Sequence, residues 1–279
     1  MKTFCVMFDA EYAFQALALM SSIQSHITSK HFIRILALDD YTIDMAERIP
    51  SPSFEVVTLE HLIRIEPRLI EARKNRTWRE FCWTVKSVFL RWCMQRDTSD
   101  VTTYLDADLF FFDDPEICFG ELGDKILGIV PHRFPSQDTG KEVNGIFNAG
   151  AIFARQEALP IIEEWVEQCL DGCKDTATFT DQIYLDAWPK RLGEKLHIFD
   201  NVRVGVAPWN ILSYAVDEGP CIQDKRIVFY HFHEINYTKP EKLRLLTHYK
   251  LRETDMRFVY QFYFKVLDMI YRQVSTTYA

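Results

Sequence analysis

Two patterns of apolar and polar positions alternate along the chain. Short, almost continuous apolar runs bounded by polar residues predict buried strands, and apolar residues spaced by three or four predict helices. The predicted strands are residues 3–8, 32–38, 54–59, 101–105, 125–130 and 226–233, with a strand–turn–strand at 145–154. The predicted helices are residues 12–23, 78–94, 157–170, 181–191 and 255–274.

Strands that alternate with helices through the first half predict βαβ units, an α/β fold and a mostly parallel sheet flanked by helices. Ligands of such sheets bind at the carboxyl ends of the strands. Asp9, Asp39 and Asp106 each follow a predicted strand. They are therefore candidates for a nucleotide-binding crevice, although aspartates also begin ordinary turns.

The last predicted helix carries an apolar stripe that includes Met256, Val259, Tyr263, Leu267 and Ile270. Such a stripe favours packing on the preceding domain. A dimer contact, or a peripheral contact with a membrane surface, is the alternative.

Composition narrows the classes of partner. The chain has 279 residues and a formal net charge of -8, which argues against nucleic-acid binding. Its seven cysteines are odd in number and include no Cys-x-x-Cys pair, and residues 1–13 show no secretory pattern. Together these features favour free thiols and a cytoplasmic location. No apolar run is long enough to predict a membrane span.

Two carboxylates, Asp106 and Asp108, follow the apolar stretch that ends at Tyr104-Leu105. Residues two apart in an extended segment point to the same side, so both carboxylates could bind one cation. Carboxylate oxygens suit Mg²⁺ or Mn²⁺ together with substrate phosphates. A solvated turn is the alternative. The phenylalanines at 110–112 are expected in the core beside this site.

Five segments resemble those of nucleotide-sugar-dependent glycosyltransferases with the GT-A fold, especially family 8 and its relatives. YLDADLFFFDDP resembles the family's DXD segment, and FDAEYAFQALALMSSI its first strand and helix. FNAGAIFAR, DQIYLDAW and FYHFHEINYTKP resemble three further motifs, in the family's order. The resemblance implies a GT-A catalytic domain over residues 1–250, with residues 251–279 as a C-terminal helical extension packed on it.

The resemblance also implies a metal site for Mn²⁺ or Mg²⁺. Asp108 would bind the metal directly, Asp106 would share it and face the ribose, and His231 would be the third ligand. The HFHE segment departs from the family's more usual His-x-x-Gly, in which glycine allows close approach. His231 and His233 lie on one face of an extended strand, so alternation alone does not choose between them.

The remaining roles that the resemblance implies concern the donor. The nucleotide and diphosphate would contact Asp9, Tyr12 and Lys239, with Lys86 or Arg91 as a second cation. The sugar and its transfer would involve Asn148, Asp181 and Gln182. The APWNI segment, residues 207–211, resembles one near the acceptor side.

The sequence therefore predicts an enzyme that moves a sugar from a nucleotide-sugar, with UDP as the expected nucleotide, to a saccharide or glycan acceptor. The resemblance implies retention of anomeric configuration. A sugar-phosphate nucleotidyltransferase is one alternative, but no Gly-rich phosphate loop follows the first strand. A phosphatase would need a threonine two residues after its DxD pair, which is absent. A nucleotide-sugar or glycan binding protein without turnover is the non-enzymatic alternative.

Overall fold

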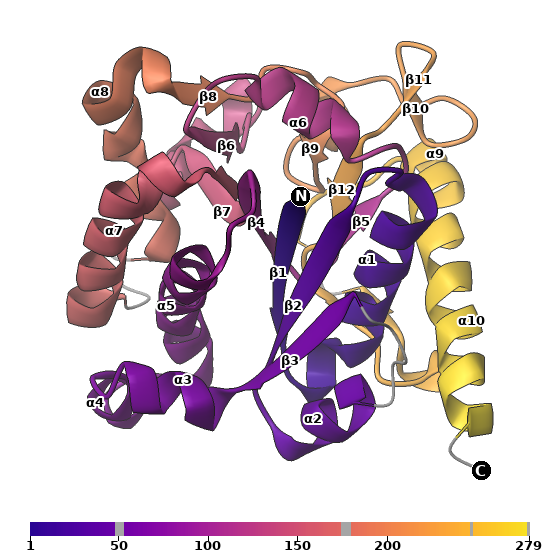
Figure 1. Ribbon diagram of the computed structural model, residues 1–279. Coiled ribbons are helices and arrows are strands. Elements are labelled where there is room, and N and C mark those ends of the chain that lie inside the picture. Colours follow the sequence, from indigo (N-terminus) through magenta and orange to yellow (C-terminus); the bar gives the residue numbers. More distant parts are fainter. Residues whose placement is uncertain (48–52, 174–179, 246–247, 278–279) are drawn as a thin grey trace.

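A seven-stranded sheet forms the centre of the computed structural model, which describes residues 1–47, 53–173, 180–245 and 248–277 (Figure 1). From one edge to the other, the strands are β3 (Phe54–Thr58), β2 (His31–Ala37), β1 (Lys2–Phe8), β4 (Val101–Asp106), β7 (Phe147–Ala154), β6 (Leu127–Pro131) and β8 (Leu196–Ile198). Only β7 runs against its neighbours, so the sheet is mostly parallel, as the alternating pattern predicted.

Alternate residues of the central strands enter two different cores. In β1, Cys5 and Met7 belong to one apolar cluster, whereas Phe4, Val6 and Phe8 belong to the other. Because both faces are covered, residues 4–8 of β1 are apolar in an unbroken run rather than at every second position. This double burial explains why the first strands could be located from the sequence.

Helices form a layer on each face of the sheet (Figure 1). The first cluster packs under α5 and α7, and the second under α1 and α6. The α-helices are α1 (Ala13–His26), α2 (Asp40–Glu47), α3 (Leu59–Ile65), α4 (Leu69–Lys74), α5 (Trp78–Arg96), α6 (Glu116–Leu122), α7 (Leu159–Gly172), α8 (Trp188–Leu192), α9 (Glu253–Asp255) and α10 (Gln261–Thr277).

Helix α10 lies along α1 at the outside of the molecule (Figure 1). A π-helical turn at Met256–Tyr260 leads into it, and Tyr263, Leu267 and Ile270 are buried in a third apolar cluster. The predicted helix and its buried stripe are thus present. The division into a catalytic domain and an extension stays a prediction.

A second, three-stranded sheet places β12 (Phe229–His231) between β5 (Leu109–Phe111) and β9 (Val204–Val206). Two-residue strands form the hairpin β10 (Cys221–Ile222) with β11 (Lys225–Arg226), and the pair β13 (Ile235–Asn236) with β14 (Arg244–Leu245). The phenylalanines at 110–112 are buried, as expected.

Three predicted elements differ in the structure. Residues 145–154 form the single strand β7, because the chain turns at Gly145 (φ 112°) before the strand begins. Residues 181–191 form a 3₁₀ helix, Asp181–Ala187, followed by the short α8. The late strand β12 has three residues instead of eight.

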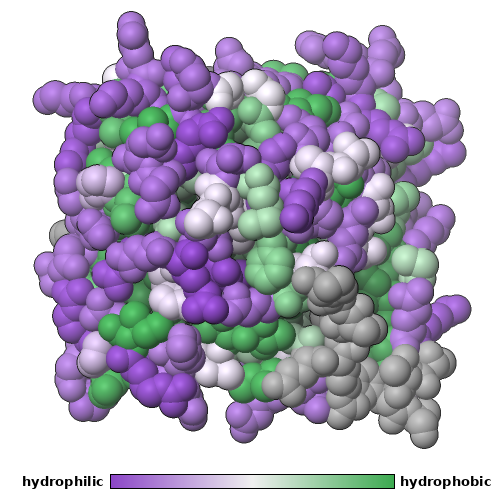
Figure 2. Space-filling view, viewed as in Figure 1, coloured by the Kyte–Doolittle hydropathy of each residue, from purple (hydrophilic) through white to green (hydrophobic). Residues whose placement is uncertain are grey.

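Two features of the exterior complete the fold. Hydrophilic side chains cover most of the face in Figure 2, and apolar ones gather there only in small groups. Among the described residues, no helix is both long and apolar enough to cross a membrane.

Candidate functional site

The carboxyl ends of β1 and β4 lie side by side, with Met7 opposite Asp106 in the parallel register. Asp9 follows β1, and its Oδ2 accepts a hydrogen bond from the Trp78 indole at 2.7 Å. Asp39 follows β2, where its carboxylate accepts from the backbone of Ala10 and Thr42 at 2.8 Å each. Asp39 therefore stabilises turns through backbone hydrogen bonds. Asp106, at the end of β4, is the first residue of the candidate site.

A tight turn, rather than a continuous strand, separates the two aspartates. Strand β4 ends at Asp106, residues 107 and 108 turn, and β5 begins at Leu109. Pairing of β5 with β12 puts His231 opposite Leu109, and Phe232 N donates to the Asp108 carbonyl at 2.8 Å. The late histidine segment is thereby held against the aspartate pair.

Asp108, His231 and His233 form a compact group of metal-binding side chains. One ligand atom from each lies within 4.8 Å of those of the other two. The His231 Nε2 is 3.0 Å from Asp108 Oδ1, and both side chains are buried. Burial alone would raise the pKa of Asp108, but the neighbouring His231 outweighs it and lowers that pKa. Burial alone would likewise lower the pKa of His231, but the neighbouring Asp108 outweighs this effect and raises that pKa.

Gly150 allows the side chains around it to converge. A Cβ built there would lie 2.6 Å from Asn148 Oδ1, 2.7 Å from His231 Cε1 and 2.9 Å from Asp106 Oδ2. Real Cβ atoms do not approach other atoms so closely, so any larger residue would displace the site. The glycine of the FNAG segment therefore gives Asp106, Asn148 and His231 their closeness.

Lys86 on α5 joins two of the predicted acidic residues in a buried ion-paired group. Its Nζ lies 3.1 Å from Asp106 Oδ1 and 2.9 Å from Asp181 Oδ2. Burial alone would lower the pKa of Lys86, but the two carboxylates outweigh it and raise that pKa. Burial raises the pKa of Asp181 against the opposing effect of Lys86. The Tyr104 hydroxyl, fully buried, also donates to Asp106 Oδ1 at 2.9 Å.

The other predicted donor residues lie in more varied surroundings. Burial, followed by the charges of Asp108 and Asp9, raises the pKa of the Tyr12 hydroxyl. Gln182 donates to the Asn144 carbonyl at 2.8 Å. Lys239 is exposed, 3.9 Å from Glu241.

Arg91, the alternative to Lys86, is engaged elsewhere. Its guanidinium donates to Glu66 at 3.0 Å. Of the two predicted cations on α5, the structure therefore brings only Lys86 to the aspartates.

Sequence reasoning missed His132, and it placed Trp209 only in a segment expected near the acceptor side. His132 directly follows β6, and its Nε2 is 3.2 Å from Asn148 Nδ2. Burial lowers the pKa of His132 to about 3, so the ring is neutral at pH 7. Trp209 meets the rings of His132, His231 and His233 edge-on, with centroids 5.2–5.6 Å apart. The position of His132 at a strand's carboxyl end was the one available sequence signal.

Asn210, the neighbour of Trp209 in the APWNI segment, has a structural role. Its side chain donates to the carbonyls of His132 and Gly205 and accepts from Ala207 N. Through these hydrogen bonds the Asn210 amide stabilises the loop that carries Trp209.

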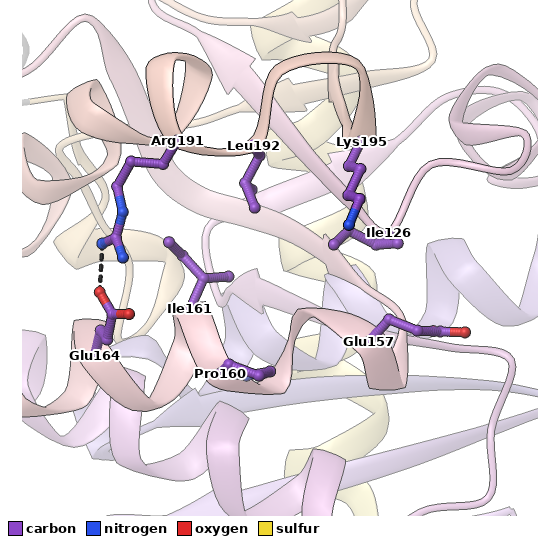
Figure 3. Close-up of a pocket in the computed structure, with 8 residues that line it drawn as sticks. All are labelled: Ile126, Glu157, Pro160, Ile161, Glu164, Arg191, Leu192 and Lys195. Atoms are coloured by element: carbon purple, nitrogen blue, oxygen red, sulfur yellow. Dashed lines mark ion pairs between the residues drawn. The ribbon is translucent and has the colours of Figure 1, made fainter.

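A cavity of about 290 Å³ lies elsewhere, between α7 and the end of α8 with the turn that follows it (Figure 3). It is lined by Ile126, Glu157, Pro160, Ile161, Glu164, Arg191, Leu192 and Lys195, and an ion pair joins Glu164 to Arg191. Ile126 precedes β6, whereas His132 follows it, so this cavity is at the opposite end of that strand. It contains none of the site residues described above.

Comparison with known proteins places the chain structurally. No family model matches it. Two proteins of Bacillus subtilis strain 168 are similar in sequence. "Uncharacterized protein YfnD" is 28% identical over 93% of this chain and 86% of that protein. "Uncharacterized protein YfnF" is 26% identical over 98% and 94%.

Three solved structures share the architecture. The galactosyltransferase LgtC, with donor and acceptor sugar analogs, has a TM-score of 0.54 at 16% identity over 95% of each chain. Mouse xyloside xylosyltransferase 1 has a TM-score of 0.53 at 13% identity, over 83% of this chain and 97% of its own. The glycosyltransferase GlyE of Streptococcus pneumoniae TIGR4 has a TM-score of 0.56 at 15% identity, over 98% and 64%. The chain therefore has the GT-A fold, as its motifs predicted.

Proposed function

We propose that this protein is a metal-dependent glycosyltransferase. It would move a sugar from a nucleotide-sugar, with UDP as the nucleotide, to a saccharide or glycan acceptor, with retention of configuration. The observation that carries the proposal is the group of carboxylates and imidazoles at the carboxyl ends of β1 and β4 in a GT-A fold. Retention rests on the resemblance of the motifs to family 8.

The charge of this group fits a divalent cation. Lys86 pairs with two of the site's carboxylates, Asp106 and Asp181, and the third, Asp108, pairs with His231. Metal binding requires neutral imidazoles, and three carboxylates with one ammonium then leave two negative charges in a largely buried setting, which a divalent cation would offset. Asp108 and His231 would hold the metal, and Asp106 would share it. A bound Mn²⁺ or Mg²⁺ would act as a Lewis acid on the diphosphate leaving group.

The residues around Asp9 would bind the nucleotide. The Trp78 indole fixes the Asp9 carboxylate, leaving it oriented to accept from a base or ribose. The Tyr12 ring, which is 37% exposed, offers a face on which uracil can stack. Lys239, which is exposed, would supply a positive charge to the diphosphate.

The residues around Lys86 would position the sugar. Asn148 presents its amide beside Gly150, where its Oδ1 accepts from Gly150 N at 2.9 Å. Asp181 is buried, and its negative charge would favour the positive charge that develops at the anomeric carbon. Gln182 would bind sugar hydroxyls from the same 3₁₀ helix. Lys86 holds Asp106 and Asp181 in fixed positions and supplies positive charge near the diphosphate.

Seven free cysteines support a cytoplasmic setting for this activity, where nucleotide-sugars and reduced thiols occur together.

Calorimetric titration of UDP, with Mn²⁺ or with EDTA, tests the donor site. We expect binding that requires Mn²⁺ and is lost in Asp108→Ala. Asp124→Ala is the matched control, because its carboxylate is 91% exposed and precedes β6 at the opposite end of the sheet. A UDP affinity that changes neither with EDTA nor in Asp108→Ala would contradict the proposed site.

A second assay separates the enzyme from the alternatives. Turnover of a UDP-sugar panel identifies a transferase, whereas metal-dependent UDP binding with no turnover would favour a binding protein. Formation of a nucleotide-sugar from UTP and a sugar 1-phosphate would identify a nucleotidyltransferase.

A further inference from the structure

His233 and Glu234 occupy positions that the motif resemblance leaves unassigned. In a His-x-x-Gly segment the residue three after the histidine is glycine, whereas here it is Glu234. The backbone at this position nevertheless has φ 61°, in the left-handed region that favours glycine. The chain therefore keeps the local turn and pays a conformational cost to place a carboxylate there.

The Glu234 carboxylate lies beside the histidine pair. Its Oε1 is 3.8 Å from His233 Nε2, and its Oε2 is buried without a hydrogen-bond partner among the described residues. A buried carboxylate oxygen without a partner is unfavourable unless a positive charge is near. Lys86, the buried ammonium of the site, is already shared by Asp106 and Asp181.

His233 is held toward the same point as His231. The two residues flank Phe232, whose ring stacks on Tyr263 of α10 with the ring centroids 3.7 Å apart. The Trp209 ring lies edge-on to both imidazoles, with centroids 5.2 Å from His231 and 5.6 Å from His233. The ligand atoms of His231, His233 and Asp108 fall within 4.8 Å of one another.

From this geometry we infer that His233 is a further ligand of the divalent cation, and that Glu234 is the positioning residue that orients it. Asp108, His231 and His233 then form a set of two imidazoles and one carboxylate. This inference rests on the proposed function, since it concerns the metal of the same site. The sequence left open whether His231 or His233 binds the metal, and we infer that both do.

The ligand set determines which metals bind. Imidazole nitrogen suits first-row transition metals, whereas Mg²⁺ prefers oxygen ligands and keeps its waters. A carboxylate next to a ligating histidine fixes the ring and increases its basicity. The site is therefore expected to select Mn²⁺ and its heavier neighbours over Mg²⁺, in contrast to a site built from two aspartates alone.

Spectroscopy of bound Mn²⁺, without nucleotide, tests the inference independently of activity. Electron paramagnetic resonance measures Mn²⁺ affinity, and pulsed methods count the coordinated imidazole nitrogens. We expect two nitrogens in the natural protein and one in His233→Ala, with Mg²⁺ at equal concentration failing to displace Mn²⁺. One nitrogen in the natural protein, or no Mn²⁺ binding at all, would overturn the assignment.

Two variants of Glu234 separate orientation from folding. Glu234→Gln keeps the strained backbone and removes the charge, and Glu234→Gly also removes the strain. Both should weaken Mn²⁺ binding about 10- to 100-fold, as losses of such supporting carboxylates do. Glu234→Gly should do so without a lower Tm. Unchanged Mn²⁺ affinity in both would refute the role of Glu234.

Gln223→Gly is the matched control. Gln223 also has a left-handed backbone, with φ 54°, but lies in the turn between β10 and β11. This variant should retain natural Mn²⁺ affinity. If Mn²⁺ binds through both histidines but no UDP-sugar is turned over, the metal assignment stands and the proposed transferase function fails.

Discussion

Gly150→Ala should damage the candidate site far more than the fold. The added Cβ would lie 2.6–2.9 Å from Asn148 Oδ1, His231 Cε1 and Asp106 Oδ2. Ordinary contacts of a Cβ begin near 3.4 Å, so these atoms must move apart by roughly half an ångström or more. All three side chains belong to the proposed metal and donor site.

The expected magnitudes differ for stability and for binding. Overpacking a buried position costs about 1–3 kcal/mol. For a chain in this size range, each kcal/mol lowers Tm by about 2–4 °C. Misplacement of reacting groups by about 1 Å costs on the order of 100-fold in rate. The variant should therefore remain folded while its Mn²⁺-dependent UDP binding and its turnover fall sharply.

Gly128→Ala provides the matched comparison. Gly128 lies in β6 of the same sheet, and its added Cβ would meet Leu122 and Phe199 at 3.0 Å in the apolar core. It should lose a similar amount of stability and keep UDP affinity. The assay is thermal unfolding together with calorimetry on both variants. If Gly150→Ala binds UDP with Mn²⁺ as tightly as the unsubstituted protein does, the role given to Gly150 in this site is refuted.

Two further predictions concern buried charges. Lys86→Met leaves Asp106 and Asp181 without their shared cation, so the free energy of unfolding at pH 7 should fall by about 3–5 kcal/mol, measured by urea denaturation. A loss below that of an ordinary surface substitution would contradict the ion-paired group. Hydrogen bonds from Arg68, with those from Arg91, lower the pKa of Glu66 to about 2 against the effect of burial. Because the folded pKa lies below the ordinary 4.5, this stabilisation is complete above pH 4.5 and is lost as pH falls toward 2. Glu66→Gln should thus cost on the order of 2 kcal/mol at pH 7, and the difference from the natural protein should shrink in urea titrations between pH 4 and 2. A difference independent of pH would contradict this assignment.

The sequence predicted the sheet well where burial was complete on both faces. Strands β1, β2 and β4 are buried over most of their length, and their ends located Asp9, Asp39 and Asp106. The short strands β5 and β12 pair residues about 120 positions apart, and nothing local reports such pairing. The three phenylalanines were therefore expected as core, without the strand β5 to which Phe110 and Phe111 belong.

The site was only partly predictable for the same reason. The aspartate pair and the two histidines carry a motif, so they could be found from the sequence. The link from Lys86 to Asp181 joins α5 to a distant 3₁₀ helix, and the packing of Trp209 on three histidines arises from loops. The resemblance to His-x-x-Gly marked residue 234 as a usual glycine position, but the glutamate itself did not show that the left-handed backbone is kept there.

Release of UDP from a panel of UDP-sugars, with Mn²⁺ present, is the most direct measurement of the central claim. We expect release from at least one UDP-sugar, abolished by EDTA and by Asp108→Ala but not by Asp124→Ala. Release that persists in Asp108→Ala, or no release from any UDP-sugar with or without saccharide acceptors, would contradict it.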